Sequence, residues 1–186
     1  MSDFARLLET EIPRLRRYAR ALTHDASRAD DLVQSSLLRA VAKQHLWQPG
    51  TDLRAWLFTI LHNQYVNDVR RSAREGVTIP VEDVTVAASD DVGAALQLRD
   101  LEWAIASLSE GQRQVILLLG LEGMRYEEVA AILGIPVGTV RSRLSRGRDA
   151  LRALMGESEE DRAERKADSA PRRVRQLDDV REISAA

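Results

Sequence analysis

The sequence predicts an all-α protein made of two small helical domains joined by a flexible linker. Hydrophobic residues make up 44% of the 186 residues but aromatic residues only 4%, so a core built mainly from Ala and Leu is expected. Apolar residues recur at intervals of three and four over most of the chain, which is typical of amphipathic helices. Residues 75–92 lack this periodicity, are acidic, and contain Gly76 and Pro80. They are predicted to be the linker.

The first domain, residues 1–74, is expected to begin with helices over 3–22 and about 26–44. Pro13 cannot donate a helical hydrogen bond, so a kink or break is expected before it. Asp25 is a good N-cap for the second helix. The Pro-Gly pair within 46–52 indicates a loop. The buried stripe of the first helix is predicted to comprise Phe4, Leu8, Ile12, Leu15, Tyr18, Ala19 and Leu22.

A long helix over about 53–73 carries two stripes. One is apolar and predicted to face the core, whereas the other changes from apolar to amide to basic. The second stripe comprises Trp56, Ile60, Asn63, Asn67, Arg70 and Arg74. Such a surface suits an unstacked base at one end and phosphates at the other. The alternative, that the final arginines merely complement the helix dipole, is equally compatible with this stripe alone. Trp47 and Trp56 suit either core packing or base stacking, and packing is favoured for Trp56.

The second domain, residues 93–155, is expected to open with a helix from about 92 to 107. Ser109 and Gln112 match a capping box, and the very apolar helix from Gln112 to Leu121 is predicted to be its centre. Two further helices, 126–133 and 137–154, are separated by Gly134 and Pro136. Glycine tolerates the left-handed conformation that ends a helix, and proline is tolerated where a helix begins.

The last of these helices has an apolar seam and an outer face rich in arginine and serine. The seam is predicted to comprise Val137, Val140, Leu144, Leu151 and Leu154. The outer face carries Arg141, Ser142, Arg143, Ser145, Arg146 and Arg148. Arginine and serine bond both base edges and phosphates, so a DNA-reading helix-turn-helix is favoured over an ordinary hairpin with a solvated charged face.

Composition excludes several other kinds of protein. The chain has no Cys, and its three histidines, predicted to be surface or promoter-facing, lack the spacing of a zinc helix. No metal site, cofactor, small-molecule substrate or catalytic residue is therefore expected, so the protein is not expected to be an enzyme. No apolar run is long enough to span a membrane and no signal peptide is evident, so a cytoplasmic protein is expected. Residues 156–186 are highly charged and predicted to form a disordered or loosely helical tail.

Three stretches in this order resemble the bacterial extracytoplasmic-function (ECF) sigma factors of the sigma-70 superfamily. They are Ala29–Ala40, Gly50–Asn63 and Pro136–Arg148. Respectively, they are similar to the helix that binds RNA polymerase core, the segment that melts and recognises the −10 element, and the helix that recognises the −35 element. The runs Leu15–Arg20 and Gly50–Leu61 also resemble the alphaproteobacterial general-stress group.

This resemblance implies a promoter-specificity subunit that binds RNA polymerase core enzyme and promoter DNA and is sequestered by an anti-sigma factor. The implied polymerase-binding residues are Asp30, Asp31, Leu32, Gln34 and Leu37. Those implied at the −10 element are Trp47, Thr51, Arg54, Trp56, Asn63, Asn67, Arg70, Arg71 and Arg74. Those implied at the −35 element are Thr139, Arg141, Ser142, Arg143, Ser145, Arg146 and Arg148.

The chain departs from the family pattern at two positions. Ser35 stands where an acidic residue is frequent, which puts one charged polymerase contact in doubt. Arg125 stands where Ser or Thr usually caps a helix, and the loss of a good cap typically costs about 0.5–2 kcal/mol.

Two alternatives remain open from the residues alone. The first is a stand-alone helix-turn-helix regulator that binds an operator without polymerase, although no receiver-like pattern precedes the hairpin. The second is a helical protein-binding adaptor whose charged helix is merely solvated. The net charge of −2 favours a protein that meets DNA as part of a larger assembly.

Overall fold

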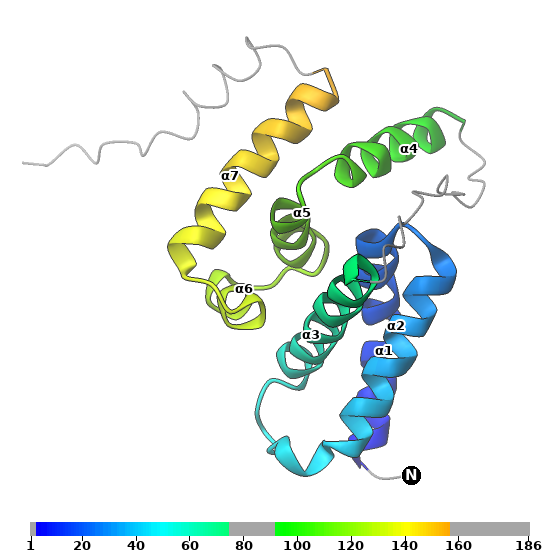
Figure 1. Ribbon diagram of the computed structural model, residues 1–186, viewed down its shortest axis with the longest axis vertical. Helices are drawn as coiled ribbons and strands as arrows, with labels where there is room; N and C mark the ends of the chain where they lie inside the picture. Colours follow the sequence, from blue (N-terminus) through cyan, green and yellow to red (C-terminus); the bar gives the residue numbers. More distant parts are fainter. Residues whose placement is uncertain (1–2, 75–91, 157–186) are drawn as a thin grey trace, which may run out of the picture. The chain divides into compact units, whose positions relative to one another are not determined.

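The computed structural model describes residues 3–74 and 92–156, and within these ranges all regular structure is helical (Figure 1). The all-α prediction is therefore confirmed. The predicted linker, except Val92, and the predicted tail after Gly156 lie outside the described residues. The elements are α1 (Asp3–Thr23), α2 (Ala26–Ala42), η1 (Gln44–Leu46), α3 (Leu53–Arg74), α4 (Val92–Ala106), α5 (Glu110–Ile116), η2 (Leu117–Leu121), α6 (Tyr126–Leu133) and α7 (Val137–Leu154).

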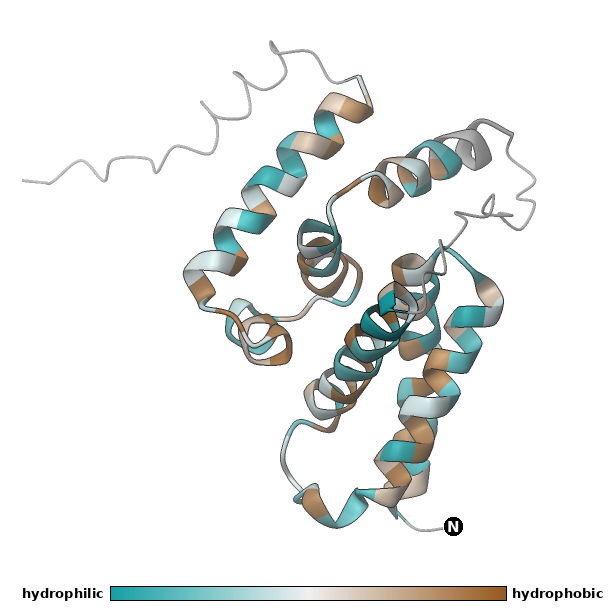
Figure 2. Ribbon diagram, in the orientation of Figure 1, coloured by the Kyte–Doolittle hydropathy of each residue, from teal (hydrophilic) through white to brown (hydrophobic). Residues whose placement is uncertain are grey.

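Helices α1, α2 and α3 pack together around a dense apolar core. Hydrophobic and hydrophilic residues alternate in bands along α2, as amphipathic packing requires (Figure 2). Tyr18 and Phe58 are fully buried at the centre of this bundle, with their ring centroids 5.2 Å apart. Aromatic pairs at this spacing add to the stabilisation from area burial alone. This pair fills the centre of the bundle, whereas the aromatic residues Trp103 and Tyr126 are exposed.

Helix α1 continues through Pro13, so of the expected kink or break the break does not occur. Pro13 lies on an exposed face, as does Glu9, whose carbonyl loses its helical partner because proline has no N–H. Water can satisfy that carbonyl on an exposed face, and the buried residues on the other side hold the helix together.

The predicted cap of α2 is confirmed, because the Asp25 carboxylate accepts a hydrogen bond of 2.9 Å from the Arg28 backbone N–H. Asp52 plays a similar part at the start of α3, where its carboxylate accepts a 3.0 Å bond from the Ala55 N–H. Carboxylates at these positions satisfy N–H groups that have no partner inside the helix. The two caps therefore fix where α2 and α3 begin.

The expected capping box at Ser109 is wrong. Ser109 precedes α5, but its side chain makes no capping hydrogen bond, and the helix begins at Glu110 rather than Gln112. The apolar run then changes from α-helix to a π-helical turn, η2, in which the Glu122 N–H bonds the Leu117 carbonyl at 3.0 Å. A π-turn inserts one residue and so rotates the end of the helix relative to an α-helix. Glu122 is therefore placed on a different side from the one that the apolar period predicts.

The helix-turn-helix is confirmed as helices α6 and α7. Gly134 has a φ of +63°, the left-handed conformation expected at this turn. Val140 and Leu144 are buried against α5 and α6, as the predicted seam requires. The seam is shorter than expected, because Leu151 is half-buried and Leu154 is 37% exposed. The final turn of α7 is thus only partly covered.

The N-terminus of α6 is stabilised without a Ser or Thr cap. The Glu128 carboxylate accepts hydrogen bonds of 2.7 Å from both the backbone N–H and the Nε of Arg125. An arginine side chain offers no acceptor, so only the Glu half of a capping box is formed. The hydrogen bonds from Arg125 lower the pKa of the Glu128 carboxyl. Glu128 therefore offsets part of the loss expected from Arg125.

Candidate nucleic-acid interface

One exposed stripe of α3 brings together four of the predicted −10 residues. Asn63, Asn67, Arg70 and Arg74 are all exposed, and their spacings of four, three and four residues place them on one helix face. Arg71 is also exposed, but it lies beside this stripe and pairs with Asp68 at 3.1 Å. The stripe offers amide donors and acceptors at one end and two guanidinium groups at the other. This arrangement can bond base edges and backbone phosphates of one strand.

Trp47 and Trp56 pack on Phe4 at the other end of α3. The ring centroids of Phe4 and Trp47 are 5.6 Å apart, and those of Phe4 and Trp56 are 6.4 Å apart. Both indoles are partly exposed, and the Nε1 of Trp47 is buried without a hydrogen-bond partner. Packing, the favoured interpretation of Trp56, therefore accounts for one face of each ring. Thr51 lies in the loop before α3, exposed, with its hydroxyl donating to the Gln48 carbonyl at 2.7 Å.

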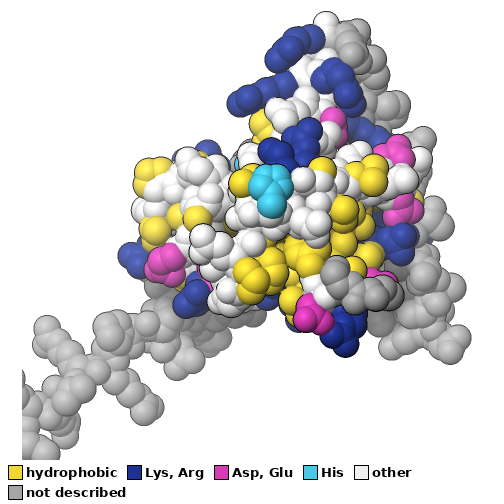
Figure 3. Space-filling model, turned by 90° about the horizontal axis from the view of Figure 1, so that it is seen from below, with side chains coloured by type: hydrophobic (Ala, Val, Ile, Leu, Met, Phe, Trp, Pro, Cys, Tyr) yellow, Lys and Arg dark blue, Asp and Glu magenta, His cyan; other side chains and the backbone are white. Residues whose placement is uncertain are grey.

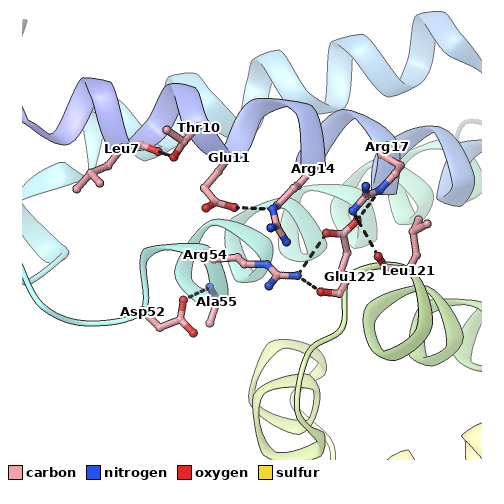
Figure 4. Close-up of polar contacts among 10 residues, drawn as sticks. All are labelled: Leu7, Thr10, Glu11, Arg14, Arg17, Asp52, Arg54, Ala55, Leu121 and Glu122. Carbon is pink, nitrogen blue, oxygen red and sulfur yellow. Dashed lines mark hydrogen bonds and ion pairs between the residues drawn. The ribbon is translucent and has the colours of Figure 1, made fainter.

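Arg54 is separated from the rest of the predicted −10 residues by its contacts. Its guanidinium lies 3.4 Å from the Glu122 carboxylate and also donates to the Glu122 backbone carbonyl. Arg17 of α1 reaches the same carboxylate at 2.9 Å (Figure 4). We call Arg17, Arg54 and Glu122 the Glu122 cluster. Neither Arg17 nor Glu122 was predicted as a functional residue, because they lie 105 positions apart and nothing in the local pattern links them.

The predicted polymerase-binding residues of α2 divide into exposed and buried positions. Asp31 and Gln34 are exposed, and Asp30 is exposed but pairs with Arg16 at 3.6 Å. Leu37 is half-buried, whereas Leu32 is only 4% exposed and supports the helix from inside the bundle.

Two further residues of α2 extend its exposed face. Leu38 is 67% exposed and Val41 is 51% exposed. They follow Gln34 at helical spacing and therefore continue the face that carries it. Sequence reasoning passed over them because an apolar residue in an amphipathic helix is ordinarily assigned to the core.

Helix α7 presents most of the predicted −35 residues to solvent. Arg141, Ser142, Ser145, Arg146 and Arg148 are exposed, and Thr139 is half-buried. Several of these side chains are held in place by neighbours. The Arg146 guanidinium donates to the carbonyl and the hydroxyl of Ser142, at 3.3 Å each. The Arg141 guanidinium lies 5.7 Å from the centre of the Tyr126 ring.

Arg143 differs from the other arginines of α7 because it contacts α5. A Cβ atom built on Gly111 would lie 3.0 Å from the Arg143 guanidinium carbon, so only glycine leaves this side chain its full space. Arg143 is correspondingly half-buried. It is therefore placed between α5 and α7, where it can hold the two helices together.

The histidines are not uniformly on the surface. His45 is exposed, but His62 is 8% exposed, so its expected surface position is wrong. Burial lowers the pKa of the His62 imidazole and so favours its neutral form. His24 is half-buried. Within residues 3–74 and 92–156, no three His, Asp or Glu side chains are grouped closely enough to hold a metal ion.

A groove of about 940 Å³ lies between α1 and the helices α4, α5 and α7. Its apolar lining includes Leu98, Leu101 and Leu121, and its rim includes the arginines at positions 16, 17 and 20. An apolar groove with a basic rim suits an amphipathic helix that carries acidic residues.

Seen from below, the molecule presents a face on which hydrophobic side chains gather near the centre and Lys and Arg side chains gather toward one edge (Figure 3).

Known proteins match this chain over both helical parts. Residues 8–62 match the family model described as the Sigma2 domain of PhyR, and residues 98–151 match sigma-70 region 4. The ECF RNA polymerase sigma factor EcfG of Rhodopseudomonas palustris is 42% identical over 150 residues, covering 77% of this chain and 80% of that protein. This chain belongs to the ECF family of RNA polymerase sigma factors. The membership favours a sigma factor over the stand-alone regulator and the adaptor considered above.

Solved structures of ECF sigma factors agree with this assignment. The sigma factor RpoE of Bartonella quintana, in complex with the anti-sigma factor NepR, is 39% identical with a TM-score of 0.74, covering 85% of this chain and 99% of that one. CnrH, in complex with the cytosolic domain of CnrY, is 29% identical with a TM-score of 0.62, covering 83% and 89%. Together with the EcfG match, the RpoE match confirms the expected general-stress group. No helix within the described ranges is long and apolar enough to cross a lipid bilayer.

Proposed function

We propose that this ECF sigma factor directs RNA polymerase core enzyme to promoters by two separate DNA contacts. The observation that carries the proposal is the pair of exposed polar and basic helix faces, on α3 and α7. The domain of residues 1–74 would bind the polymerase and the −10 element, and the domain of residues 93–155 would bind the −35 element. Residues 75–92 would link them. The protein acts in the cytoplasm as a binding subunit and performs no catalysis of its own.

On α3, an extruded −10 base would be captured by Asn63 together with the loop of residues 46–52, which contains Trp47. Extruding a base costs a few kcal/mol, which stacking and amide hydrogen bonds offset. Asn67, Arg70, Arg71 and Arg74 would then hold the adjacent backbone. The exposed positions of these side chains support this arrangement.

On α2, the polymerase would contact the acidic residues and the exposed apolar positions together. Asp31 and Gln34 supply polar contacts, and Leu38 and Val41 supply apolar surface that water otherwise covers. Apolar residues exposed beside polar ones mark protein interfaces. Leu32 would act only by holding the helix in place.

The −35 contact is tested by Arg146→Ala, with Arg99→Ala as control. Both changes remove one exposed positive charge, but Arg99 lies on α4, outside both proposed DNA surfaces. We expect Arg146→Ala to weaken −35-dependent run-off transcription by about 1–3 kcal/mol, with polymerase binding unchanged. Equal activity of the two variants, or loss of polymerase co-purification by Arg146→Ala alone, would contradict the assignment.

We further propose that an anti-sigma factor binds the groove between α1 and the helices α4, α5 and α7. Two related structures are complexes with anti-sigma factors, and the groove offers the apolar floor and basic rim described above. Leu98 is 47% exposed at this groove, so Leu98→Glu should leave the fold intact. We expect it to weaken anti-sigma binding by about 1–2 kcal/mol, measured by titration calorimetry. Unchanged affinity would place the partner elsewhere.

A further inference from the structure

The Glu122 cluster contains the most completely buried charge among the salt bridges of the described residues. The Glu122 side chain is 0% exposed, whereas those of Arg17 and Arg54 are 51% and 25% exposed. Arg17 donates to the carboxylate from Nε at 3.1 Å and from Nη2 at 2.9 Å, and its Nη2 also donates to the Leu121 carbonyl at 3.3 Å. A carboxylate is buried in this way only when cations and hydrogen bonds compensate for its lost hydration.

The placement of Glu122 depends on the π-turn that precedes it. The Glu122 N–H donates to the Leu117 carbonyl and the Met124 N–H donates to the Leu118 carbonyl, at 3.0 Å each. These bonds hold the chain after α5 so that the carboxylate points to α1 and α3 (Figure 4). The region-4 part of the chain thus supplies an acidic group to two arginines of the region-2 part.

The two arginines form a site suited to a phosphate group. Two guanidinium groups that converge on one anion are a recurrent arrangement for carboxylate and phosphate recognition. The Nε of Arg54 is buried and has no hydrogen-bond partner, so the site retains a donor that Glu122 does not use. A phosphodiester presents two anionic oxygens, as a carboxylate does, but in a tetrahedral rather than a planar arrangement.

Contact between Glu122 and Arg54 is incompatible with simultaneous engagement of both promoter elements. Elements centred at −10 and −35 lie about 25 base pairs apart, or about 85 Å at 3.4 Å per base pair. In this structure Arg54 and Glu122 are 3.4 Å apart, and α3 packs against α6. The Glu122 cluster must therefore separate before both helix faces reach their elements.

We propose that Arg17 and Arg54 form an anion site that Glu122 occupies in the free protein and that a backbone phosphate of the promoter strand occupies after region 4 separates. The proposal rests on the proposed function, in which the domain of residues 1–74, which contains both arginines, binds the −10 element. Glu122 acts as an internal competitor for DNA at this site. Release of the carboxylate and capture of the phosphate exchange one anion for another without leaving either arginine uncompensated.

The first test measures separation in the full chain without polymerase or promoter. The chain has no native Cys, so Lys43→Cys and Ala153→Cys, both at exposed positions, can carry spin labels. We expect Glu122→Gln to lengthen and broaden the distance distribution between the labels. Arg17→Gln, at a half-exposed side chain, should change it in the same direction and serves if Glu122→Gln folds poorly. Distributions identical to wild type in the folded variants would overturn the proposal.

The second test measures anion binding with a fluorescent twelve-nucleotide oligothymidine, which offers phosphates without a promoter sequence. Glu127→Gln is the matched control, because it also removes one negative charge, at an exposed position of α6. We expect Glu122→Gln to bind at least about fivefold tighter than Glu127→Gln in low salt, the lower range of coupling between two sites. Adding Arg54→Gln should abolish the gain. Equal affinities of Glu122→Gln and Glu127→Gln would overturn the proposal.

These outcomes are independent of the test of Arg146. Suppose that Glu122→Gln separates the labels and raises oligothymidine binding, while Arg146→Ala transcribes normally. The competition by Glu122 is then supported, and the −35 assignment is wrong. If Arg146→Ala loses transcription while Glu122→Gln behaves as Glu127→Gln, the sigma-factor mechanism stands and the competition by Glu122 fails.

Discussion

At the residue scale, His24 shows how backbone and burial together set a side chain's chemistry. It follows α1 with a φ of +55°, a conformation that is uncommon for residues other than glycine but that Asn, Asp and His adopt more often than most. Its Nε2 is buried without a hydrogen-bond partner. Burial, together with the positive charge of Arg113, lowers the pKa of the imidazole from 6.5 to about 4. The fold therefore favours neutral His24.

Substituting His24 should change how stability depends on pH. The pKa of His24 is lower in the native state than in the unfolded state. Neutral His24 therefore makes its full contribution to the stability of the fold above pH 6.5, and this contribution is lost as the pH falls toward 4. His24→Asn tolerates the positive φ and does not titrate. The ring is only partly buried, so a moderate effect is expected. Between pH 7 and pH 4, the free energy of unfolding of the variant should fall by about 1–2 kcal/mol less than that of wild type.

Urea unfolding at both pH values measures this difference. His45→Asn, at an exposed position, should keep the wild-type dependence on pH. If the free energy of unfolding changes equally with pH in wild type and in His24→Asn, protonation of His24 is not coupled to unfolding.

At the scale of elements, the contact between α5 and α7 depends on a glycine inside a helix. Gly147 is buried in the middle of α7. A Cβ atom built on it would lie 2.6 Å from Cδ1 of Ile116 and 3.3 Å from Cβ of Gln112. The absence of a side chain lets the recognition helix approach α5 closely. Gly138, in the first turn of the same helix, has open space around its Cβ position.

The two glycines allow a matched comparison of one substitution. Alanine is the better helix former by roughly 1 kcal/mol, so Gly138→Ala should leave stability unchanged or raise it. Gly147→Ala must displace the Ile116 side chain and would crowd the Cβ of Gln112, so we expect it to be about 1–3 kcal/mol less stable than Gly138→Ala. Chemical denaturation measures both. Equal stabilities would mean that α5 and α7 adjust to the added methyl group without cost.

At the scale of the whole molecule, two DNA surfaces coexist with a net charge of −2. The exposed faces of α3 and α7 carry basic side chains, but basic residues are not confined to them, since α1 alone contains five arginines. Non-specific attraction to DNA grows with the number of phosphates neutralised, so a chain with a net negative charge gains little from it. The local faces therefore contribute to site choice more than to affinity, and polymerase supplies the remaining contacts.

The free chain is accordingly expected to bind promoter duplex weakly. We expect a Kd no tighter than about 1 μM at physiological salt, the range of non-specific binding, and tighter binding once core polymerase is added. Fluorescence anisotropy of a labelled duplex, with and without core enzyme, measures both states. Nanomolar, sequence-specific binding by the free chain would instead support an operator-binding regulator.

Much of the helical framework followed from local patterns. Asp25 caps α2 and Gly134 ends α6, as predicted. Both could be predicted because a cap and a left-handed turn are local requirements that neighbouring residues specify. The faces of α3 and α7 were predictable for the same reason, since helical periodicity determines which residues share a side. Ser109 and Leu154 were mispredicted, because a cap and an apolar seam also depend on what packs against them.

By itself, the sequence determined the helical class, the helix-turn-helix and the family, since each is encoded in short-range spacing and recognisable stretches. Only the tertiary structure decided the partners of Arg54, the exposure of Leu38 and Val41, and the burial of His62. These depend on contacts between residues that are distant in the chain, where local periodicity carries no information. Glu122 is the clearest case: a π-turn redirects its carboxylate, and two arginines 68 and 105 positions away determine its environment.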